Sequence, residues 1–352
     1  TLYNITMAYS SITNPRNFMN PKLYAGNGSA GNAITGVGFQ PDLVWLKSRT
    51  NTEYQNWYDS IRGVTKRLVS NLPSAETTLS GLTAFGTDGF TVGAADTANQ
   101  NSNNFVSWNW KAGTTGSGTT TGSGTGKAYS YSVSTTAGFS IVKYLGNGTA
   151  GHTIPHHLGA VPKIIIVKKV NASDDWKVYS THLTNAQSIR LDQTGSYDND
   201  TTSWNSTTPT SSVFTVGTSS ATNTNDSTYI AYSFTDIVGY SRFGSHVGNG
   251  NVNGPYVHLG FKPAFLMIKD VTSTGEWLVW DNKRSPSNEM TKALAANDSL
   301  VEDTTKEMDF LSNGFKIRTT DTNYNASGNT NIYLAFAEEP FVASNFNVAT
   351  AR

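Results

Sequence analysis

The chain has 352 residues, and its 25 Lys and Arg residues balance 25 Asp and Glu residues, so its net charge is zero. We therefore expect no nucleic-acid partner, because proteins that bind nucleic acids by neutralising phosphates are usually basic. The absence of cysteine excludes disulfides, Cys-based zinc sites and a Cys nucleophile. No apolar run approaches the roughly 18 residues of a membrane span, so we expect no membrane insertion.

The first motif along the chain is GNGSAG at residues 26–31, which matches the G-x-G-x-x-G pattern of dinucleotide-binding loops. GNGTAG at residues 146–151 matches it too, whereas GNGNVNG at residues 248–254 breaks the spacing. No predicted helix follows any of the three stretches, so none can direct a helix N-terminus at a phosphate. We interpret them as hairpin loops in which Asn-Gly supplies positive φ, and we predict no cofactor.

Two kinds of apolar strand recur in constant order. PDLVWLK from Pro41 returns as PKIIIVK and PAFLMIK, after 121 and then 101 residues. The closing strand FVSWNW from Phe105 returns as YIAYSF and NIYLAF, with a large apolar residue at every second position. Alternation of this kind predicts strands with one buried face.

The repeats predict an all-β fold of three tandem β-sandwich (jelly-roll-like) modules of about 100 residues each. A β-propeller is the alternative, although propeller blades of about 40–50 residues are half as long as this repeat. We place the modules at residues 1–110, 129–236 and 237–352. Residues 111–128, KAGTTGSGTTTGSGTGKA, contain no large apolar residue, so we expect a flexible linker there and a stiff pair of second and third modules.

Aromatic residues at repeated positions are the candidate site. Trp176 and Trp277 occupy one repeat position, where the first repeat has Gln55. Three residues later, on the opposite face of the same predicted strands, stand Tyr58, Tyr179 and Trp280. One face must therefore expose aromatic rings unless both faces are covered. Exposed rings would suit stacking on sugars, and the alternative is packing between modules or subunits.

Signals for catalysis or metal binding are weak. The chain has no G-x-S-x-G, H-E-x-x-H or Walker motif. The histidines His152, His156, His157 and His182 gather in the second repeat, where loop polarity is the simpler explanation. Loops rich in Asp and Asn, such as Asp321 to Asn325, lack the Glu and Gly of a calcium loop, so we favour Asx turns. We predict no catalytic residue and no metal.

Taken in order, LYAGNGSAG, GFQPDLVWLK, DSIRGVTKRL, PTSSVFTVG, GYSRFGSHVGNGNVNG and DFLSNGFKIR make the chain similar to tandem-repeat structural proteins of tailed bacteriophages, notably of marine bacteria. The similarity runs along nearly the whole chain. It implies a virion structural or tail-fibre-like protein with no established catalytic residues, located on the virion.

From this resemblance we expect a non-enzymatic surface component, most consistent with a tail fibre or adhesin that contacts host glycans. Its expected partners are other virion proteins, further copies of itself in a homo-oligomer, with a trimer favoured, and host surface polysaccharide. A head decoration protein with a purely structural role is the second hypothesis. A glycan depolymerase is the third, and it lacks an evident pair of catalytic acids.

Overall fold

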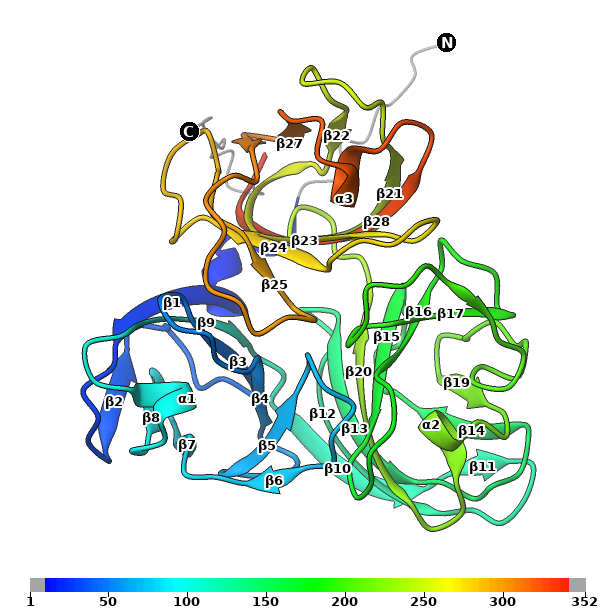
Figure 1. Cartoon of the computed structure of the whole chain (residues 1–352). Coiled ribbons are helices and arrows are strands. Elements are labelled where there is room, and N and C mark those ends of the chain that lie inside the picture. Colours follow the sequence, from blue (N-terminus) through cyan, green and yellow to red (C-terminus); the bar gives the residue numbers. More distant parts are fainter. Residues whose placement is uncertain (1–9, 342–352) are drawn as a thin grey trace.

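The computed structural model describes residues 10–341, which form the all-β structure shown in Figure 1. The helices in this range are single turns, namely α1 (Asp96–Asn99), α2 (Ser220–Asn223), α3 (Thr322–Asn325) and the 3-10 turn η1 (Pro15–Asn17). The prediction of an all-β fold is confirmed. The described range holds no helix that is long and apolar enough to cross a membrane. The predicted outer module limits, residues 1 and 352, lie outside the described residues.

The described strands form six antiparallel sheets, and each sheet takes its strands from one of three consecutive parts of the chain. In the first part, module 1, a six-stranded sheet of order β1-β9-β3-β4-β5-β6 faces a three-stranded sheet of order β2-β8-β7. Its strands are β1 (Met19–Ala25), β2 (Asn32–Thr35), β3 (Leu43–Ser48), β4 (Asn56–Asp59), β5 (Lys66–Val69), β6 (Thr77–Thr78), β7 (Leu82–Gly86), β8 (Gly89–Val92) and β9 (Asn104–Trp110).

Module 2 has a larger main sheet, of order β10-β12-β13-β20-β15-β16-β17-β18, and a small sheet of order β11-β14-β19. Its strands are β10 (Thr114–Thr119), β11 (Thr121–Gly122), β12 (Ala128–Ser134), β13 (Phe139–Leu145), β14 (His152–Pro155), β15 (Ile164–Lys169), β16 (Lys177–Ser180), β17 (Gln187–Arg190), β18 (Asp198–Asn199), β19 (Val213–Val216) and β20 (Thr228–Phe234).

Module 3 repeats the plan with a main sheet of order β21-β28-β23-β24-β25 and a small sheet of order β22-β27-β26. Its strands are β21 (Ser241–Val247), β22 (Tyr256–His258), β23 (Phe261–Asp270), β24 (Leu278–Asp281), β25 (Leu294–Ala295), β26 (Met308–Leu311), β27 (Gly314–Ile317) and β28 (Thr330–Pro340). The register of the two central strands is the same in all three modules: Trp45 lies opposite Trp108, Ile166 opposite Tyr232 and Met267 opposite Leu334.

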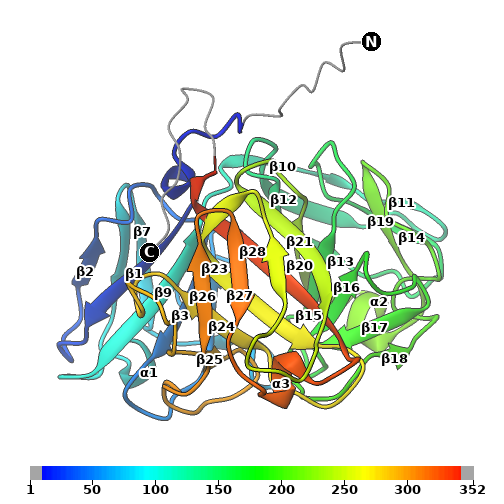
Figure 2. The same cartoon turned by 90° about the horizontal axis from the view of Figure 1, so that it is seen from above.

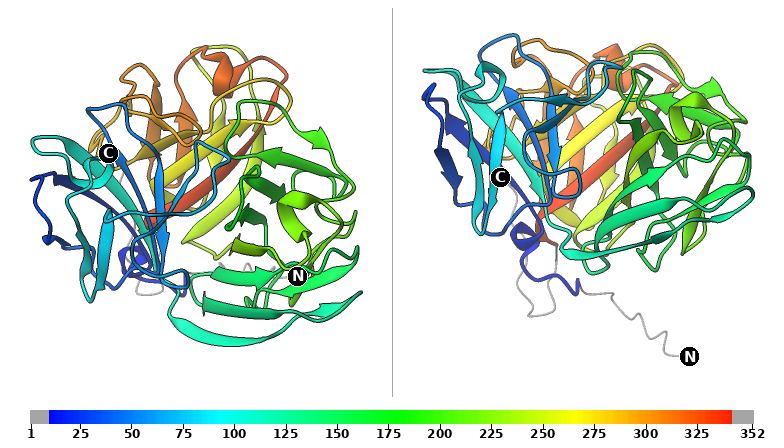
Figure 3. Two further views of the ribbon diagram at one scale, coloured as in Figure 1. Left: turned by 60° about the horizontal axis from the view of Figure 1, so that its bottom comes forward. Right: turned by 90° about the horizontal axis from the view of Figure 1, so that it is seen from below.

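The three modules are lobes around a common centre, coloured blue to cyan, green, and yellow to red in Figure 1. Viewed from above, module 3 lies in front and the other two lie on either side of it (Figure 2). Viewed from below, modules 1 and 2 face each other across the strands of module 3 (Figure 3). The main sheets face inward and the small sheets lie outside.

Alternating side chains of the main sheets divide the apolar residues between two kinds of core. On β3, Val44 and Leu46 point into a core that belongs to module 1, whereas Leu43 and Trp45 point into one core shared by all three modules. Modules 2 and 3 have their own cores in the same way. Both faces of each main sheet are therefore buried, and the closing strands are buried along nearly their whole length.

Three equivalent aromatic rings meet at the centre of the shared core. Trp110, Phe234 and Phe336 each stand at the end of the predicted alternating pattern of their closing strand. Their ring centroids lie 6.5 Å apart for Trp110 and Phe234, 5.7 Å for Trp110 and Phe336, and 5.8 Å for Phe234 and Phe336. All three contacts are edge-to-face, the geometry that aromatic pairs favour. The rings thus join the modules at a single point.

Residues 111–128 are not a flexible linker, so that prediction was wrong. Residues Thr114–Thr119 form β10, which pairs with β12 over six residues, and β11 pairs with β14 of the small sheet. Gly116 and Gly118 lie opposite Tyr131 and Tyr129, whose rings occupy the space that side chains at the glycines would need. Cross-strand aromatic rings that cover glycine stabilise edge strands, which explains how a segment without large apolar residues is ordered.

The GNG stretches connect the two sheets of a module instead of turning a hairpin within one sheet. In module 1, β1 belongs to the main sheet and β2 to the small sheet, so the predicted hairpin was wrong. The expected positive φ is present, at +70° for Gly28. The loop is held by the buried amide of Asn99, which accepts a hydrogen bond from the Asn27 N–H and donates to the Ser29 carbonyl. Asn223 and Asn325 hold the equivalent loops of modules 2 and 3.

Candidate functional site

The aromatic residues that we selected as a candidate site are all buried, each exposing at most 3% of its surface: Tyr58, Trp176, Tyr179, Trp277 and Trp280. Stacking of these rings on a glycan is therefore excluded. The alternative, packing between modules, describes two of them, because Trp176 and Trp277 lie in the shared core. Tyr58, Tyr179 and Trp280 lie in the cores of single modules. Both faces are covered because a neighbouring module closes the face that would otherwise be exposed.

The buried residue at this repeat position joins each module to the preceding one. Trp176 of module 2 donates from Nε1 to the carbonyl of Val69 in module 1, at 3.0 Å. Trp277 of module 3 donates in the same way to Arg190 of module 2, at 2.8 Å. Gln55 of module 1 closes the ring, since its Nε2 donates to Ala295 of module 3 at 2.6 Å. We call the three contacts seam 1/2, seam 2/3 and seam 3/1.

Backbone hydrogen bonds repeat around the same ring. In seam 1/2, the N–H of Glu76 donates to the carbonyl of Val170 at 2.8 Å. The equivalent bonds join Tyr197 to Val271 in seam 2/3 and Glu302 to Arg49 in seam 3/1, both at 3.0 Å. A second equivalent set joins Asp174 to Pro73, Gly275 to Thr194 and Glu53 to Ser299. Each seam is therefore closed by backbone groups, which depend on the fold and not on the side chains.

Buried charges distinguish the seams from one another. In seam 1/2, Asp59 pairs with Arg62 of its own module and accepts a 2.7 Å hydrogen bond from the hydroxyl of Tyr232 across the seam. In seam 3/1, Asp281 pairs with Arg284 and accepts from Nε1 of Trp108 at 3.0 Å. The equivalent positions of seam 2/3 hold Ser180, Leu183 and Leu334. In seam 2/3 the acid, the arginine and the hydrogen-bond donor are all replaced, because any one of these groups without the others would be buried and unpaired.

Three equivalent lysines, Lys47, Lys168 and Lys269, are buried beneath the seams and bonded to carbonyl oxygens. Lys269 donates to Thr194 across seam 2/3 and to Gly275 of its own module, both at 2.8 Å. Lys168 donates to Pro73 across seam 1/2 at 3.1 Å. Burial lowers the pKa of each of the three ammonium groups to about 8. Lys168 and Lys269 therefore stabilise seams 1/2 and 2/3, whereas Lys47 donates to Ser48 and Asn51 of its own module.

A groove of about 400 Å³ opens along seam 1/2. Module 1 contributes Arg62, Lys66 and Glu76 to its lining, and module 2 contributes Lys143, Val170 and Asn171. A neighbouring hollow of about 320 Å³, lined partly by Tyr129, Tyr144 and Leu145, also touches Lys143. None of these residues stood out in the sequence, because the groove exists only where two modules meet and its walls are distant along the chain.

The four histidines of module 2 lie in separate environments and contact different partners. His152 is buried between Asn223 and Thr120, and His156 lies on the Thr210 carbonyl, where burial lowers its pKa to about 4. His157 stacks on the Tyr131 ring with 3.8 Å between ring centroids, and His182 bonds to Phe243 across seam 2/3. Within residues 10–341, no three His, Asp or Glu side chains are placed to hold a metal ion.

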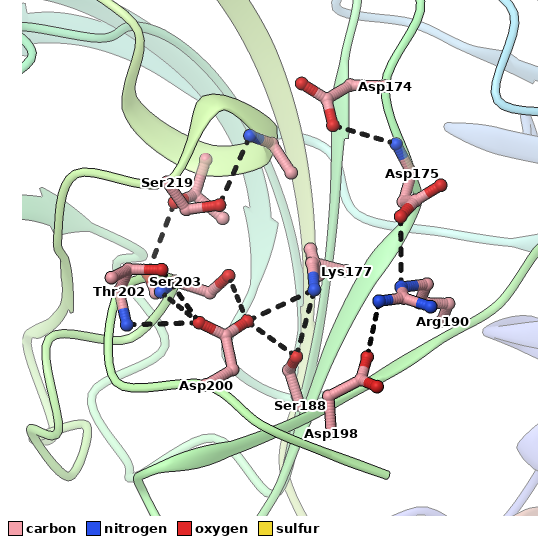
Figure 4. A network of polar contacts seen from close by, with 12 residues as sticks. Asp174, Asp175, Lys177, Ser188, Arg190, Asp198, Asp200, Thr202, Ser203 and Ser219 are labelled. Carbon is pink, nitrogen blue, oxygen red and sulfur yellow. Dashed lines mark hydrogen bonds and ion pairs between the residues drawn. The ribbon is translucent and has the colours of Figure 1, made fainter. Parts of the chain in front are cut away.

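A polar network at the β16–β18 edge of the module 2 main sheet is shown in Figure 4. Asp200 accepts hydrogen bonds from the hydroxyls of Ser203 and Ser188, and it forms an ion pair with Lys177 at 3.1 Å. Burial acts to raise the pKa of Asp200, but the serine hydrogen bonds and the lysine charge hold it below the usual range. Arg190 likewise binds Asp175 and Asp198. Every charge has a partner, so the network stabilises the β16–β17 region and offers no reactive group.

Comparison with known proteins places the chain in one family. Neither the curated proteins nor the solved structures contain a match to the chain. The model of a domain of unknown function, DUF7483, matches residues 14–340, which span all three modules and all three seams. The chain belongs to the DUF7483 family.

Proposed function

We propose that the protein is a non-enzymatic structural component of a bacteriophage virion, displayed on the particle surface as a tail-fibre or adhesin-like protein that contacts host glycans. The collinear sequence similarity to tandem-repeat virion proteins supports this. The structural observation that carries the proposal is the closed ring of seams, which joins the three modules into one body. A protein on a particle outside the cell needs such stability.

Location on the particle tests the proposal. Purified phage particles should contain the chain in mass spectrometry, and antibodies against it should label the tail in electron microscopy. Particles that lack the chain altogether would contradict a virion role.

A head decoration protein is the second candidate. The observation that favours it is the arrangement of three similar lobes around one centre, which suits a threefold position on a capsid surface (Figure 1). Antibody labelling confined to the capsid would select this candidate over the fibre.

The proposed partners are other virion proteins and further copies of the chain, with a homotrimer favoured. Light scattering on the purified chain tests the trimer, because the mass of one chain or of three is measured directly. The proposal also predicts that no reducing sugar is released when the chain is incubated with host polysaccharide, whereas a depolymerase would release it.

A further inference from the structure

The groove at seam 1/2 carries a local excess of positive charge. Arg62 pairs with two carboxylates, Asp59 and, at 3.1 Å, Glu76, so these three groups together carry one negative charge. Lys66 donates only to the hydroxyl of Thr78, at 3.1 Å, and has no acidic partner among the described residues. The backbone of Lys143 pairs with β12 and β20, but its ammonium group has no hydrogen-bond or ion-pair partner within residues 10–341. Two half-buried ammonium groups, one from each module, therefore line the groove without an acidic partner of their own, and they leave it with a net positive charge.

The adjoining hollow adds an apolar surface to these cations. The hollow shares Lys143 and Thr228 with the groove, so the two adjoin each other at these residues. Leu145 is half-buried there beside Ala128, on the same face of the sheet as Lys143, whereas the Tyr129 ring lies on the opposite face against the module 2 core. The C–H faces of sugar rings pack on surfaces of this kind, and ammonium groups bind carboxylates. Small-ligand sites combine a mainly apolar lining with a few polar groups in the same way.

The walls of the groove are fixed before any ligand arrives. The carbonyl of Pro73 accepts hydrogen bonds from the Asp174 N–H at 2.9 Å, from the Ser173 hydroxyl at 3.0 Å and from Nζ of Lys168 at 3.1 Å. The Glu76 N–H binds the Val170 carbonyl beside them. Because these bonds hold the two modules in one position, binding would not have to order the seam, and a preformed site loses less entropy on binding.

The equivalent position in seam 3/1 shows what opens the groove. Where module 2 has Val170, module 1 has Arg49. The guanidinium of Arg49 binds both carboxylate oxygens of Glu302 at 2.9 Å, so its side chain lies across the seam. The shorter Val170 leaves the corresponding carboxylate, Glu76, to Arg62 and leaves the space above it open. The groove is therefore open in seam 1/2 and filled by Arg49 in seam 3/1, whereas seam 2/3 has Val271 at this position and Tyr197 in place of Glu76.

We propose that the groove at seam 1/2 binds a segment of acidic polysaccharide, with Lys66 and Lys143 contacting carboxylates of the sugar chain and Leu145 packing against a sugar ring. This inference rests on the proposed function, since it names the chemical class of glycan that the surface protein would contact. It assigns the contact to a groove between modules, whereas the aromatic residues selected from the sequence are buried.

Calorimetric titration of the full chain with oligogalacturonate, a chain of uronic acids, tests the site, and maltooligosaccharide of equal length is the neutral control. We expect binding of oligogalacturonate that weakens as salt is added, because half-exposed charges are screened. The double variant Lys66→Gln/Lys143→Gln should lose about tenfold or more in affinity, since each lysine supplies a charge-assisted contact. Lys292→Gln in module 3 should bind like the unmodified chain.

A variant that closes the groove gives an independent test. Val170→Arg reproduces Arg49 of seam 3/1 and should abolish binding while the thermal unfolding midpoint stays close to that of the unmodified chain. The inference is overturned if oligogalacturonate does not bind, if maltooligosaccharide binds equally well, or if the lysine and arginine variants bind normally. Equal binding of inorganic phosphate or of single-stranded DNA would also overturn it, because the site would then recognise charge without the sugar.

The outcome of these binding experiments is independent of the antibody labelling of phage particles that tests the proposed function. A chain that is found on virions but fails to bind loses this inference and keeps the proposed function. A chain that binds oligogalacturonate but is absent from virions keeps the groove and loses the virion role.

Discussion

The backbone N–H of Trp176 donates a 3.1 Å hydrogen bond to Oδ1 of Asp192, a buried carboxylate whose Oδ2 has no hydrogen-bond partner among the described residues. In module 1 the N–H of Gln55 binds Asn71, and in module 3 the N–H of Trp277 binds Asn297. The side-chain amide oxygen of Asn71 or Asn297 accepts the equivalent hydrogen bond without placing a charge in the core. We expect Asp192→Asn to raise the free energy of unfolding at pH 7 by about 1–3 kcal/mol, measured by denaturant titration.

The same carboxylate predicts a dependence on pH. Burial, reinforced by the charge of Asp175, raises the pKa of Asp192 to about 6 in the folded protein, above its unfolded value of 3.8. The folded state therefore takes up a proton first as the pH falls. The destabilisation by Asp192 is complete above pH 6 and is relieved as the pH falls from about 6 to about 4. The advantage of Asp192→Asn should shrink over this interval. An advantage that stays constant would show that the charge is not its cause.

Removal of one partner of the buried pair in seam 3/1 should be costly. Arg284 and Asp281 have fully buried side chains. Arg284→Leu leaves the carboxylate without its counter-charge, and we expect a loss of about 3–5 kcal/mol in the free energy of unfolding. The double variant Asp281→Ser/Arg284→Leu copies Ser180 and Leu183 of seam 2/3 and should be more stable than the single variant. Equal stability of the two variants would contradict the role of the unpaired charge.

The strand formed by residues 114–119 can be tested by proteolysis. A Cβ at Gly116 would lie 2.6 Å from the Tyr131 hydroxyl oxygen, so Gly116→Val should expel the ring and loosen the edge strand, at a local cost of about 1–3 kcal/mol. Trypsin should cleave this variant after Lys111 or Lys127 faster than the unmodified chain. Ser117→Val, which points to the other face, is the matched control and should resist cleavage. Rapid cleavage of the unmodified chain would indicate a flexible linker.

The shared core predicts that the three modules unfold together. Calorimetry should show one transition, because the ring of Trp110 contacts both Phe234 and Phe336. Trp110→Ala should lower the stability by about 3–5 kcal/mol and shift the whole transition. Separate transitions, with only one of them moved by the substitution, would contradict the single core.

Local sequence patterns predicted the strands well and their surroundings poorly. Alternation in the closing strands marked Val106, Trp108 and Trp110 as one buried face, and this face is buried in the shared core. Nothing local indicated that the other face would be buried as well. Exposure depends on what covers a sheet, so Trp176 and Trp277 could be placed on a strand face but not judged exposed or covered.

Composition misled the prediction in residues 111–128, because glycine and serine are typical of linkers. The order of this segment comes from Tyr129 and Tyr131 on the next strand, which lie against Gly116 and Gly118. The groove was missed for a related reason. Lys66 and Lys143 are far apart in the sequence, and only the docking of two modules brings them to one site.

The ring of seams has a consequence for concentration. Three separate subunits joined by the same contacts would dissociate on dilution. Here the chain itself holds every module near its neighbours, at an effective concentration of about millimolar whatever the amount of protein present. A single chain can also alter one seam and leave the others unchanged, as Val170 and Arg49 illustrate, whereas a symmetric trimer has to repeat each change three times.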